Sequence, residues 1–448
     1  MPNFNKLHLT LIPVVSTALI LVVLFTLLPQ AAGAASPDSE GDLQLSATGA
    51  SFPQIAANGT FAAIVYARSG QVFLRATQGS QGWWSAAVSV GSGATPRLAF
   101  TPNLTNEVHI VWASAAGDKI YHRRFTLAAK TGSGGTQHEV QSGSSLETPD
   151  VAVDSGSRIH VAWSTQSGTI VTRVSTDSGA SWSGAGTFSS TPSLAHQPVL
   201  AVSDGFAHLA VTEIDSGQLG YYRSALGSSH SWFKLFTQSP EGNFADIRNP
   251  AIAATDSRVY LAWDSVNASQ NNQFGLIGAL SDSNSGDEGG SWPSDTAKHI
   301  TSNADYSIGG NEKISKARST VPISEGGLRP SLAITGANFA VVWQQRPNLN
   351  CQPDEGGGPP LENGTAEVNY AATATTWSQT ETLGNDITTY AIAPDLAFNT
   401  AGRHIVFLKA TGVNCSGGGG SLGYAVYYRG PLTTVQPPEV YLPVVVKN

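Results

Sequence analysis

The chain repeats one pattern of apolar and polar positions seven times. In each unit a proline opens a short alternating run, and a second alternating run follows it, such as Ile159, Val161 and Trp163 set against His160 and Ala162. The opening prolines are Pro53, Pro96, Pro149, Pro198, Pro250, Pro330 and Pro394. Alternation with period two predicts β-strands that bury one face.

The second run of each unit ends at a bulky side chain, at a nearly constant distance from the proline. The residues at this position are Tyr66, Trp112, Trp163, Val211, Trp263, Trp343 and Phe407. A third run follows after a turn, and a tryptophan opens a fourth at Trp84, Trp182, Trp232, Trp292 and Trp377. Four short strands per repeat are typical of propeller blades, which bury their faces only by stacking into a ring. We predict an all-β chain forming a β-propeller of four-stranded blades; seven blades are favoured and six are the alternative.

Two segments inside these repeats read S-x-D-x-G-x-x-W, from Ser175 to Trp182 and from Ser285 to Trp292. They resemble the Asp box, or BNR repeat, of the sialidase-like β-propellers, and the resemblance covers most of the chain. It implies that the carboxylate accepts backbone N–H groups, the glycine supplies a positive φ and the tryptophan packs beneath. The implied structural residues are Ser175, Asp177, Gly179 and Trp182 in one box, and Ser285, Asp287, Gly289 and Trp292 in the other. A role of a box in calcium or ligand binding is the alternative.

The composition narrows the class of partner. The formal net charge is −8, only 12% of the 448 residues are charged, and lysine and arginine form no run. Nucleic-acid binding requires a concentrated basic surface, so the sequence argues against a nucleic-acid partner.

The ends of the chain predict export. Residues 1–36 are predicted to be a signal peptide or N-terminal anchor, with Lys6 before an apolar stretch from Leu9 to Leu28 and a small-residue cleavage site at Ala32 to Ala34. Residues 37–45 are predicted to be a flexible leader, 46–430 the propeller and 431–448 a C-terminal tail. We therefore expect a secreted or cell-surface protein, bacterial and monomeric, that contacts the membrane only through an uncleaved N-terminal segment.

The two cysteines of the chain occupy corresponding loops of adjacent repeats. Cys351 and Cys415 each follow the second strand, in units six and seven. In an oxidising compartment these positions predict a disulfide bond, and two free thiols are the alternative.

Strand order assigns the other charged residues to faces. Loops between strands two and three, and between successive blades, share the rim opposite the Asp boxes. That rim is predicted to carry Arg248, Arg329, Arg346, Glu213 and Asp264. Guanidinium groups bind carboxylates well, and a carboxyl group can act as a general acid or base, so this cluster suits an acidic sugar. The alternative is that these charges only keep the protein soluble.

The resemblance to sialidases has gaps that argue against catalysis. Members of that family carry Arg-Ile-Pro near the first blade, and nothing between Ser46 and Arg97 matches it. Their nucleophile is a tyrosine, and none of Tyr306, Tyr370 and Tyr390 lies in a recognisable motif.

Other chemistry has little support in the sequence. No H-E-x-x-H or C-x-x-C motif occurs. Histidines recur at the start of strand two, which predicts packing roles for His109, His160, His208 and His404. We therefore expect no metal and no cofactor. The sequence thus favours binding of a glycan or an extracellular protein through the rim opposite the boxes. A sialidase-like exo-glycosidase acting on an acidic sugar is the first alternative, and a structural surface protein is the second.

Overall fold

The computed structural model describes residues 42–79, 84–128, 131–192, 194–239, 244–255, 259–267, 273–280, 297–301, 330–335, 338–345, 367–373, 381–383, 389–411 and 424–430. The chain divides into two units, Met1–Ser36 and Pro37–Asn448, and every described residue belongs to the second. Within these ranges no helix is long and apolar enough to cross a membrane. The predicted signal segment and the C-terminal tail lie outside the described residues.

The described strands pair into seven separate sheets, numbered I to VII here along the chain. Sheet I contains β2 (Ala50–Asn58), β3 (Phe61–Arg68), β4 (Gln71–Gln78) and β5 (Val88–Ser92). Sheet II contains β6 (Ala94–Phe100), β7 (Glu107–Ala113), β8 (Lys119–Ala128) and β9 (Thr131–Ser142). Sheet III contains β10 (Leu146–Val153), β11 (Ile159–Thr165) and β12 (Ile170–Ser175). Sheet IV contains β14 (Ala195–Ser203), β15 (Phe206–Glu213), β16 (Gln218–Ala225), β17 (Ser231–Gln238) and the short β13 (Thr187–Phe188).

The remaining three sheets continue the same order. Sheet V contains β18 (Phe244–Ala254), β19 (Val259–Asn267), β20 (Gln273–Leu280) and β21 (Ala297–Thr301). Sheet VI contains β22 (Ser331–Thr335), β23 (Asn338–Gln345), β24 (Glu367–Thr373) and β25 (Glu381–Leu383). Sheet VII contains β26 (Thr389–Asn399), β27 (Gly402–Thr411), β28 (Ala425–Arg429) and β1 (Leu43–Gln44).

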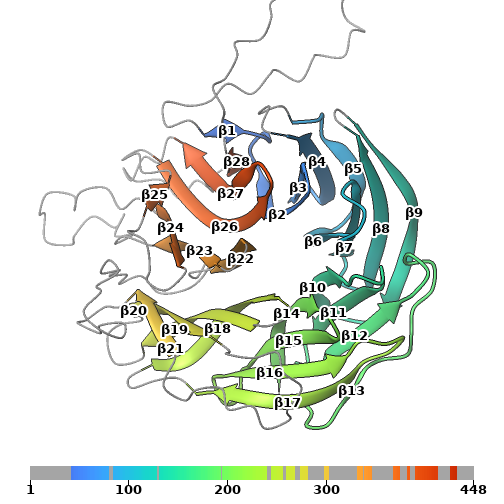
Figure 1. The fold of residues 1–448 in the computed structure, drawn as a ribbon, viewed down its shortest axis with the longest axis vertical. Helices are drawn as coiled ribbons and strands as arrows, with labels where there is room; N and C mark the ends of the chain where they lie inside the picture. The colour runs from blue at the N-terminus through green and yellow to red at the C-terminus, as the bar shows by residue number, and fades with distance from the viewer. Residues whose placement is uncertain are drawn as a thin grey trace, which may run out of the picture. The chain divides into compact units, whose positions relative to one another are not determined.

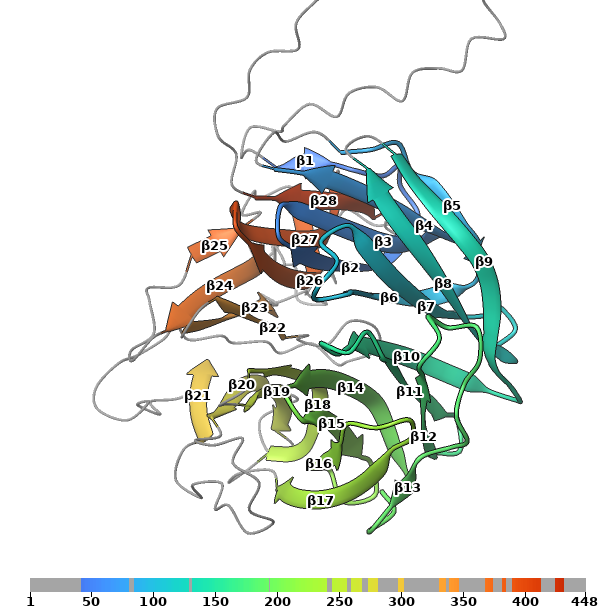
Figure 2. The ribbon, with the colours of Figure 1, turned by 45° about the vertical axis from the view of Figure 1, so that its right-hand side comes forward.

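The sheets lie around a common axis with their first strands innermost (Figures 1 and 2). Each first strand contacts the first strands of the sheets before and after it, and β26 contacts β2. The prediction of an all-β chain built from small antiparallel sheets is confirmed. We call the end of the sheets where the first strands begin the cavity face, and the end where the first strands finish the box face. Antiparallel order brings the end of the third strand to the box face, and the predicted Asp box follows that strand.

The N-terminal part of the described chain completes sheet VII, which corrects the predicted leader. Leu43 and Gln44 pair with Tyr428 and Tyr427 of β28. Asp42 is buried and forms ion pairs with Lys409 and Arg429, at 3.4 and 2.5 Å. Residues 42–44, inside the segment 37–45 that the sequence assigned to a flexible leader, are therefore held against sheet VII. A two-residue strand is too short for its alternation to be recognised.

Sheet III departs from the four-strand prediction. Trp182 was predicted to open its fourth strand, but the next strand, β13, pairs in parallel with β17 of sheet IV. Ser183 and Gly186 still bond to β12 through their backbone N–H groups before the chain crosses over. The glycine-rich stretch between Trp182 and β13 has few side chains to pack as a strand, which explains the exchange.

The bulky residues that end the second strands pack between sheets, as predicted. Trp112 of sheet II is fully buried and clusters with Val72, Leu74 and Val90 of sheet I. Its Nε1 donates to the carbonyl oxygen of Ser92 at 3.0 Å. The equivalent residues Trp163, Trp263, Trp343 and Phe407 are also fully buried. Large buried aromatic side chains dominate core energetics, so these wedges hold adjacent sheets together.

The histidines at the start of the second strands are buried on the box face and hydrogen-bonded, which confirms their packing role. His160 bonds Asp154 Oδ2 at 3.0 Å and His230 Nε2 at 2.9 Å. The equivalent contacts are His109 with His122 and Thr101, His208 with Tyr221 and Ser203, and His404 with Tyr428 and Asn399. Burial lowers the pKa of His208 to about 3 and that of His404 to about 4, so these two imidazoles stay neutral.

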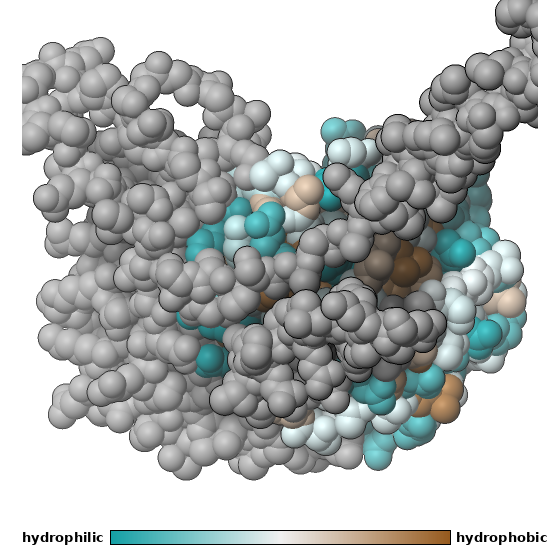
Figure 3. Space-filling view, turned by 90° about the horizontal axis from the view of Figure 1, so that it is seen from above, coloured by the Kyte–Doolittle hydropathy of each residue, from teal (hydrophilic) through white to brown (hydrophobic). Residues whose placement is uncertain are grey.

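Few large apolar side chains of the described residues are exposed. Seen from above, its described residues are mainly hydrophilic or neutral, with small hydrophobic areas between them (Figure 3). The large apolar residues that are exposed among them are Leu104, Leu194, Ile214 and Phe233. Leu194 and Ile214 lie together, because the Ile214 N–H donates to the Leu194 carbonyl oxygen at 3.1 Å.

Candidate functional site

A β-bulge interrupts the first strand at its opening proline. The pairing register with the second strand shifts at this proline in sheets I, II, III, IV, V and VII. The residue before the proline has a positive φ in each; these residues are Phe52 (52°), Thr95 (48°), Thr148 (35°), Gln197 (51°), Asn249 (45°) and Ala393 (50°). Left-handed backbone costs a residue with a Cβ about 1–2 kcal/mol. A proline cannot donate to the ladder, so the bulge is where the strand accommodates it.

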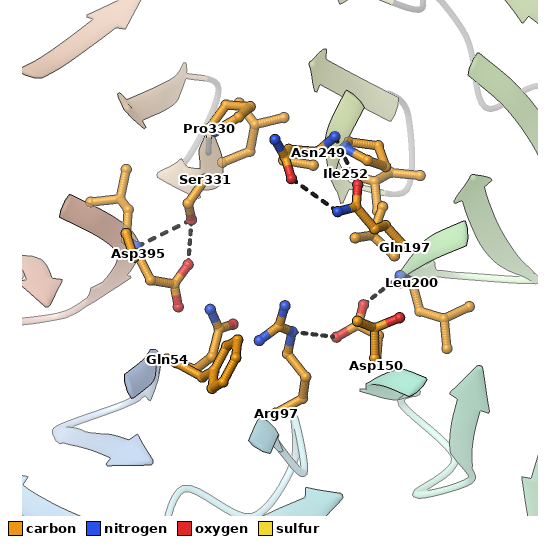
Figure 4. Close-up of a pocket in the computed structure, with 18 of the residues that line it drawn as sticks. Gln54, Arg97, Asp150, Gln197, Leu200, Asn249, Ile252, Pro330, Ser331 and Asp395 are labelled. Atoms are coloured by element: carbon orange, nitrogen blue, oxygen red, sulfur yellow. Dashed lines mark hydrogen bonds and ion pairs between the residues drawn. The ribbon is translucent and has the colours of Figure 1, made fainter. Parts of the chain in front are cut away.

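The residues around these prolines line a central cavity of about 310 Å³. Side chains from the first strands of several sheets converge on it, as Figure 4 shows. The polar residues of this lining are Gln54, Thr95, Arg97, Thr148, Asp150, Gln197, Asn249, Ser331 and Asp395. A concave site with a few convergent polar groups is the usual form of a ligand site.

Arg97 and Asp150 form the charged pair of the central cavity. Arg97 Nε lies 3.8 Å from Asp150 Oδ1, and Asp150 Oδ2 accepts a hydrogen bond from the Leu200 N–H at 2.6 Å. Burial raises the pKa of Asp150 to about 6, although Arg97 and the Leu200 N–H act in the opposite direction. The carboxyl group can therefore exchange a proton close to neutral pH, as an acid–base residue must.

Asp395 is the second carboxylate of the cavity. Its Oδ2 accepts a hydrogen bond from the Ile55 N–H at 2.7 Å, and its Oδ1 accepts one from the Ser331 hydroxyl. Burial raises the pKa of Asp395 as well. Like Asp150, Asp395 bonds the first strand of the next sheet, so each carboxylate both joins two sheets and faces the cavity (Figure 4).

Two amides form the opposite side of the cavity. Gln197 Nε2 donates to Asn249 Oδ1 at 3.1 Å, and the Asn249 N–H donates to Gln197 Oε1 at 3.0 Å. The lining thus contains a guanidinium, two carboxyl groups, amides and hydroxyls, which offer donors and acceptors together. Among the described residues no group of three or more His, Cys, Asp or Glu side chains could hold a metal ion.

A second cavity of about 330 Å³, the rim pocket, adjoins the central cavity on the cavity face. Its lining is Glu147, Thr148, His196, Gln197, Thr212, Ile214, Gly217, Ile247 and Arg248. Thr148 and Gln197 line both cavities. His196 Nδ1 lies 3.7 Å from Glu147 Oε2. The two cavities are therefore neighbours, and the rim pocket lies over sheets III to V.

The structure brings one of the five predicted rim residues into this site. Arg248 lines the rim pocket. Glu213 is buried within sheet IV, where its Oε1 accepts hydrogen bonds from Tyr222 at 2.9 Å and Lys234 at 2.7 Å. Asp264 is paired with Arg248 in the strand register, and its side chain lies outside the described residues, as do Arg329 and Arg346. Glu213 misses the pocket because its neighbour Thr212 has the strand position that faces it.

The first predicted box forms a turn after β12 that packs on sheet II. Asp177 accepts hydrogen bonds from the Ser181 N–H at 2.9 Å and from the Ser175 hydroxyl at 2.8 Å. Hydrogen bonds from Ser181 and Ser175 lower the pKa of Asp177 to about 2. Gly179 has φ +89°, and the ring of Trp182 meets His122 edge-on, 5.5 Å between centroids. These contacts fix the shape of the turn, and none reaches the candidate site.

Other predicted residues lie outside the described part of the chain. They are the second box residues Ser285, Asp287, Gly289 and Trp292, and the cysteines Cys351 and Cys415. The structural role of that box and the disulfide bond remain predictions.

The sequence contained an unused signal for the central cavity. The position after each opening proline carries Gln54, Arg97, Asp150, Val199, Ala251, Ser331 and Asp395. Charged or polar residues at five of seven equivalent places in otherwise apolar strands could have identified it. The informative feature is that the residue type at this fixed position of the repeat varies from sheet to sheet.

No protein-family model and no curated protein matches the chain. Solved structures match its fold. An ulvan lyase from a new family of polysaccharide lyases, bound to -[GlcA(1-4)Rha3S]-, has a TM-score of 0.52 at 8% identity, covering 87% of this chain and 95% of its own. A sialidase of Trypanosoma rangeli in complex with sialic acid has a TM-score of 0.47 at 9% identity, covering 89% of this chain and 56% of that one. The likeness to the ulvan lyase supports a β-propeller fold and shows the fold alone.

Proposed function

We propose that the protein is an exported seven-bladed β-propeller that binds a glycan through its cavity face. The observation that carries this proposal is the central cavity, where Arg97, Asp150, Asp395 and the Gln197–Asn249 amides converge from different sheets. A sugar hydroxyl donates and accepts hydrogen bonds, so a lining with donors and acceptors side by side suits a polyhydroxylated ligand. The ulvan lyase with the same fold is itself bound to a carbohydrate.

The first test is binding to a glycan array, followed by calorimetry on the best ligand. Removing the guanidinium with Arg97→Gln should weaken binding about tenfold or more, because hydrogen bonds to charged groups contribute about 1.5–3 kcal/mol. Arg124→Gln is the matched control, since Arg124 pairs with Glu107 at 3.4 Å on β8, away from the cavity. Equal affinities of the two variants, or no glycan bound by the wild type, would contradict the proposal. Capture of an extracellular protein without any glycan would favour the protein-binding alternative.

A glycoside hydrolase is the second candidate, because a specific observation favours it. Asp150 has a pKa raised to about 6 beside Arg97, with Asp395 in the same cavity. A carboxyl group with such a pKa can protonate a glycosidic oxygen. Release of reducing sugar from acidic glycosides, lost in Asp150→Asn with the ligand still bound, would support hydrolysis. Binding without turnover supports the glycan-binding function. If the protein neither binds nor cleaves a glycan, the structural surface protein is the alternative that remains.

The wider setting of this function is also proposed. Residues 1–36 direct export and 431–448 form a tail, in a bacterial, monomeric, secreted or surface protein. Cys351 and Cys415 form a disulfide bond, and the segments Ser175 to Trp182 and Ser285 to Trp292 are structural Asp boxes. Non-reducing peptide mapping that recovered both cysteines as free thiols would exclude the disulfide.

A further inference from the structure

The rim pocket has a charge pattern that the rest of the ring lacks. Glu147, His196 and Arg248 occupy the same position, two residues before the opening proline, in three successive sheets. The equivalent residues in sheets I and II are Ser51 and Ala94. Ionisable side chains at this position are therefore particular to sheets III to V, and the scaffold itself does not require them.

Thr212 carries a polar atom that the described structure leaves without a partner. It stands opposite His196 in the β14–β15 pair, so the two side chains share one face of sheet IV. Thr212 is 5% exposed, and its Oγ1 has no hydrogen-bond partner among the described residues. Leaving a buried hydroxyl unpaired is unfavourable. Because Thr212 lines the rim pocket, a ligand hydroxyl there can complete its hydrogen bonding.

The other side of the rim pocket is aliphatic. Ile214 is 56% exposed at its edge, and Ile247 is fully buried in its wall. Leu194, 46% exposed, extends the apolar edge beside Ile214. A ligand that fits must present an apolar side to Ile214 and a hydrogen-bonding edge to Thr212. A pyranose ring has this form, with C–H groups on its face and hydroxyls around its edge.

The charges of the rim pocket favour an uncharged ligand. One carboxylate, Glu147, and one guanidinium, Arg248, line it together, so these two give no net attraction for an ion. A single hydroxyl group can both donate to Glu147 and accept from Arg248, whereas a carboxylate group can only accept and an ammonium group can only donate.

We propose that the rim pocket binds an uncharged sugar residue of an oligosaccharide whose neighbouring residue enters the central cavity. Thr148 and Gln197 line both cavities, so the two are neighbours and adjacent residues of one ligand can reach both. This inference rests on the proposed glycan-binding function. It adds that the ligand has at least two residues and that the one at the rim is neutral.

The test compares Thr212→Val with Thr77→Val by calorimetry. The probes are uncharged gluco-, galacto- and manno-configured di- and trisaccharides and their monosaccharides. Valine keeps the shape of threonine and removes the hydroxyl, so Thr212→Val should bind the best oligosaccharide about three- to tenfold more weakly and the monosaccharide unchanged. Thr77 also has a buried Oγ1 without a partner, and it lines neither cavity. Thr77→Val should therefore match the wild type in affinity, while thermal unfolding of both variants shifts upward by similar amounts.

The outcomes separate the inference from the function it rests on. If Thr212→Val binds the oligosaccharide as tightly as the wild type, the rim subsite is wrong and glycan binding stands. A parallel titration uses the same disaccharides with one sugar replaced by its uronic acid. If Thr212→Val weakens binding of only these acidic disaccharides, the residue at the rim is charged and the inference is overturned. If the wild type binds no probe of any kind, the proposed function fails first.

Discussion

The box face and the cavity face are built from the same repeats and treat their polar residues in opposite ways. On the box face, the histidines that open the second strands recur in several sheets and bond to neighbouring side chains. On the cavity face, the residues beside the prolines differ from sheet to sheet, and the residue before the proline has a positive φ. Repetition of one residue type marks the scaffold, and variation at a fixed position marks a candidate binding site.

The strongest test of this contrast is Asp154 on the box face. Asp154 is buried and bonds Arg158 Nε at 2.6 Å and His160 Nε2 at 3.0 Å. Asp154→Ala removes the acceptor of both the Arg158 guanidinium and His160 Nε2, which is buried, so unfolding in urea should show a loss of about 3–5 kcal/mol. Asp204→Ala, in the equivalent turn of sheet IV but exposed, is the control and should lose less than about 1 kcal/mol. A loss of that small size at Asp154 would remove the distinction between the faces.

The same residue predicts an acid limb in the stability profile. Burial alone would raise the pKa of Asp154, but hydrogen bonds from His160 and Arg158 outweigh it and lower the pKa to about 2. The ionised carboxylate therefore stabilises the fold above its ordinary pKa of 3.8, and this contribution is lost as pH falls toward 2. Asp154→Ala should flatten this part of the profile, measured by urea unfolding at a series of pH values.

A smaller loss is expected from Gly179, in the turn that follows β12. A Cβ at this position would lie 2.1 Å from the imidazole of His122, and φ is +89°. Gly179→Ala should destabilise the protein by about 2–3 kcal/mol, as overpacking and backbone strain combine. Gly184→Ala is the control in the same loop. A Cβ at Gly184 has open space around it, so this variant should unfold like the wild type. Similar melting of the two variants would mean that the box does not pack on His122.

On the cavity face, removing a charge should stabilise. Burial raises the pKa of Asp150 to about 6, so its contribution to stability is present below pH 3.8 and is lost as pH rises through 6. Asp150→Asn keeps an acceptor for the Leu200 N–H and has no charge to bury, and should raise the free energy of unfolding at pH 7.5 by about 2 kcal/mol. At pH 4 the variant and the wild type should unfold alike. Destabilisation at pH 7.5 would show that Asp150 belongs to the scaffold.

The smallest expected effect concerns the strained position before the proline. Ala393 has φ +50°, so Ala393→Gly removes a steric penalty while adding disorder to the unfolded chain. The two terms partly cancel, and we expect a gain of up to about 1 kcal/mol. Ala397→Gly in the same strand, without a positive φ, should lose about 0.5–1 kcal/mol. Thermal melts in which both variants lose stability equally would show that the bulge carries no strain.

The sequence predicted the fold better than the site because packing leaves a periodic record. Trp112 and Trp163 recur at one position and wedge between sheets, so their role could be predicted from spacing alone. The site arises where unlike residues such as Arg97 and Asp150 converge from different repeats, and no spacing within one repeat predicts that. Glu213 shows this limit most directly. Neighbouring residues of a strand face opposite sides of the sheet, so Thr212 lines the rim pocket while Glu213 is buried against Lys234.

The pairing of β1 with β28 means that sheet VII can be completed only after the last described strand has been synthesised. Val426 donates to Ser46 across 380 residues of sequence. At about 5–20 residues per second, a nascent chain waits about 20–80 s between the synthesis of these two partners. Throughout that interval the edge of the last sheet does not exist, and the opening strand has nothing to join. Molecules stalled or cut short before β28 would carry an unpaired strand at the front, a natural target for quality control.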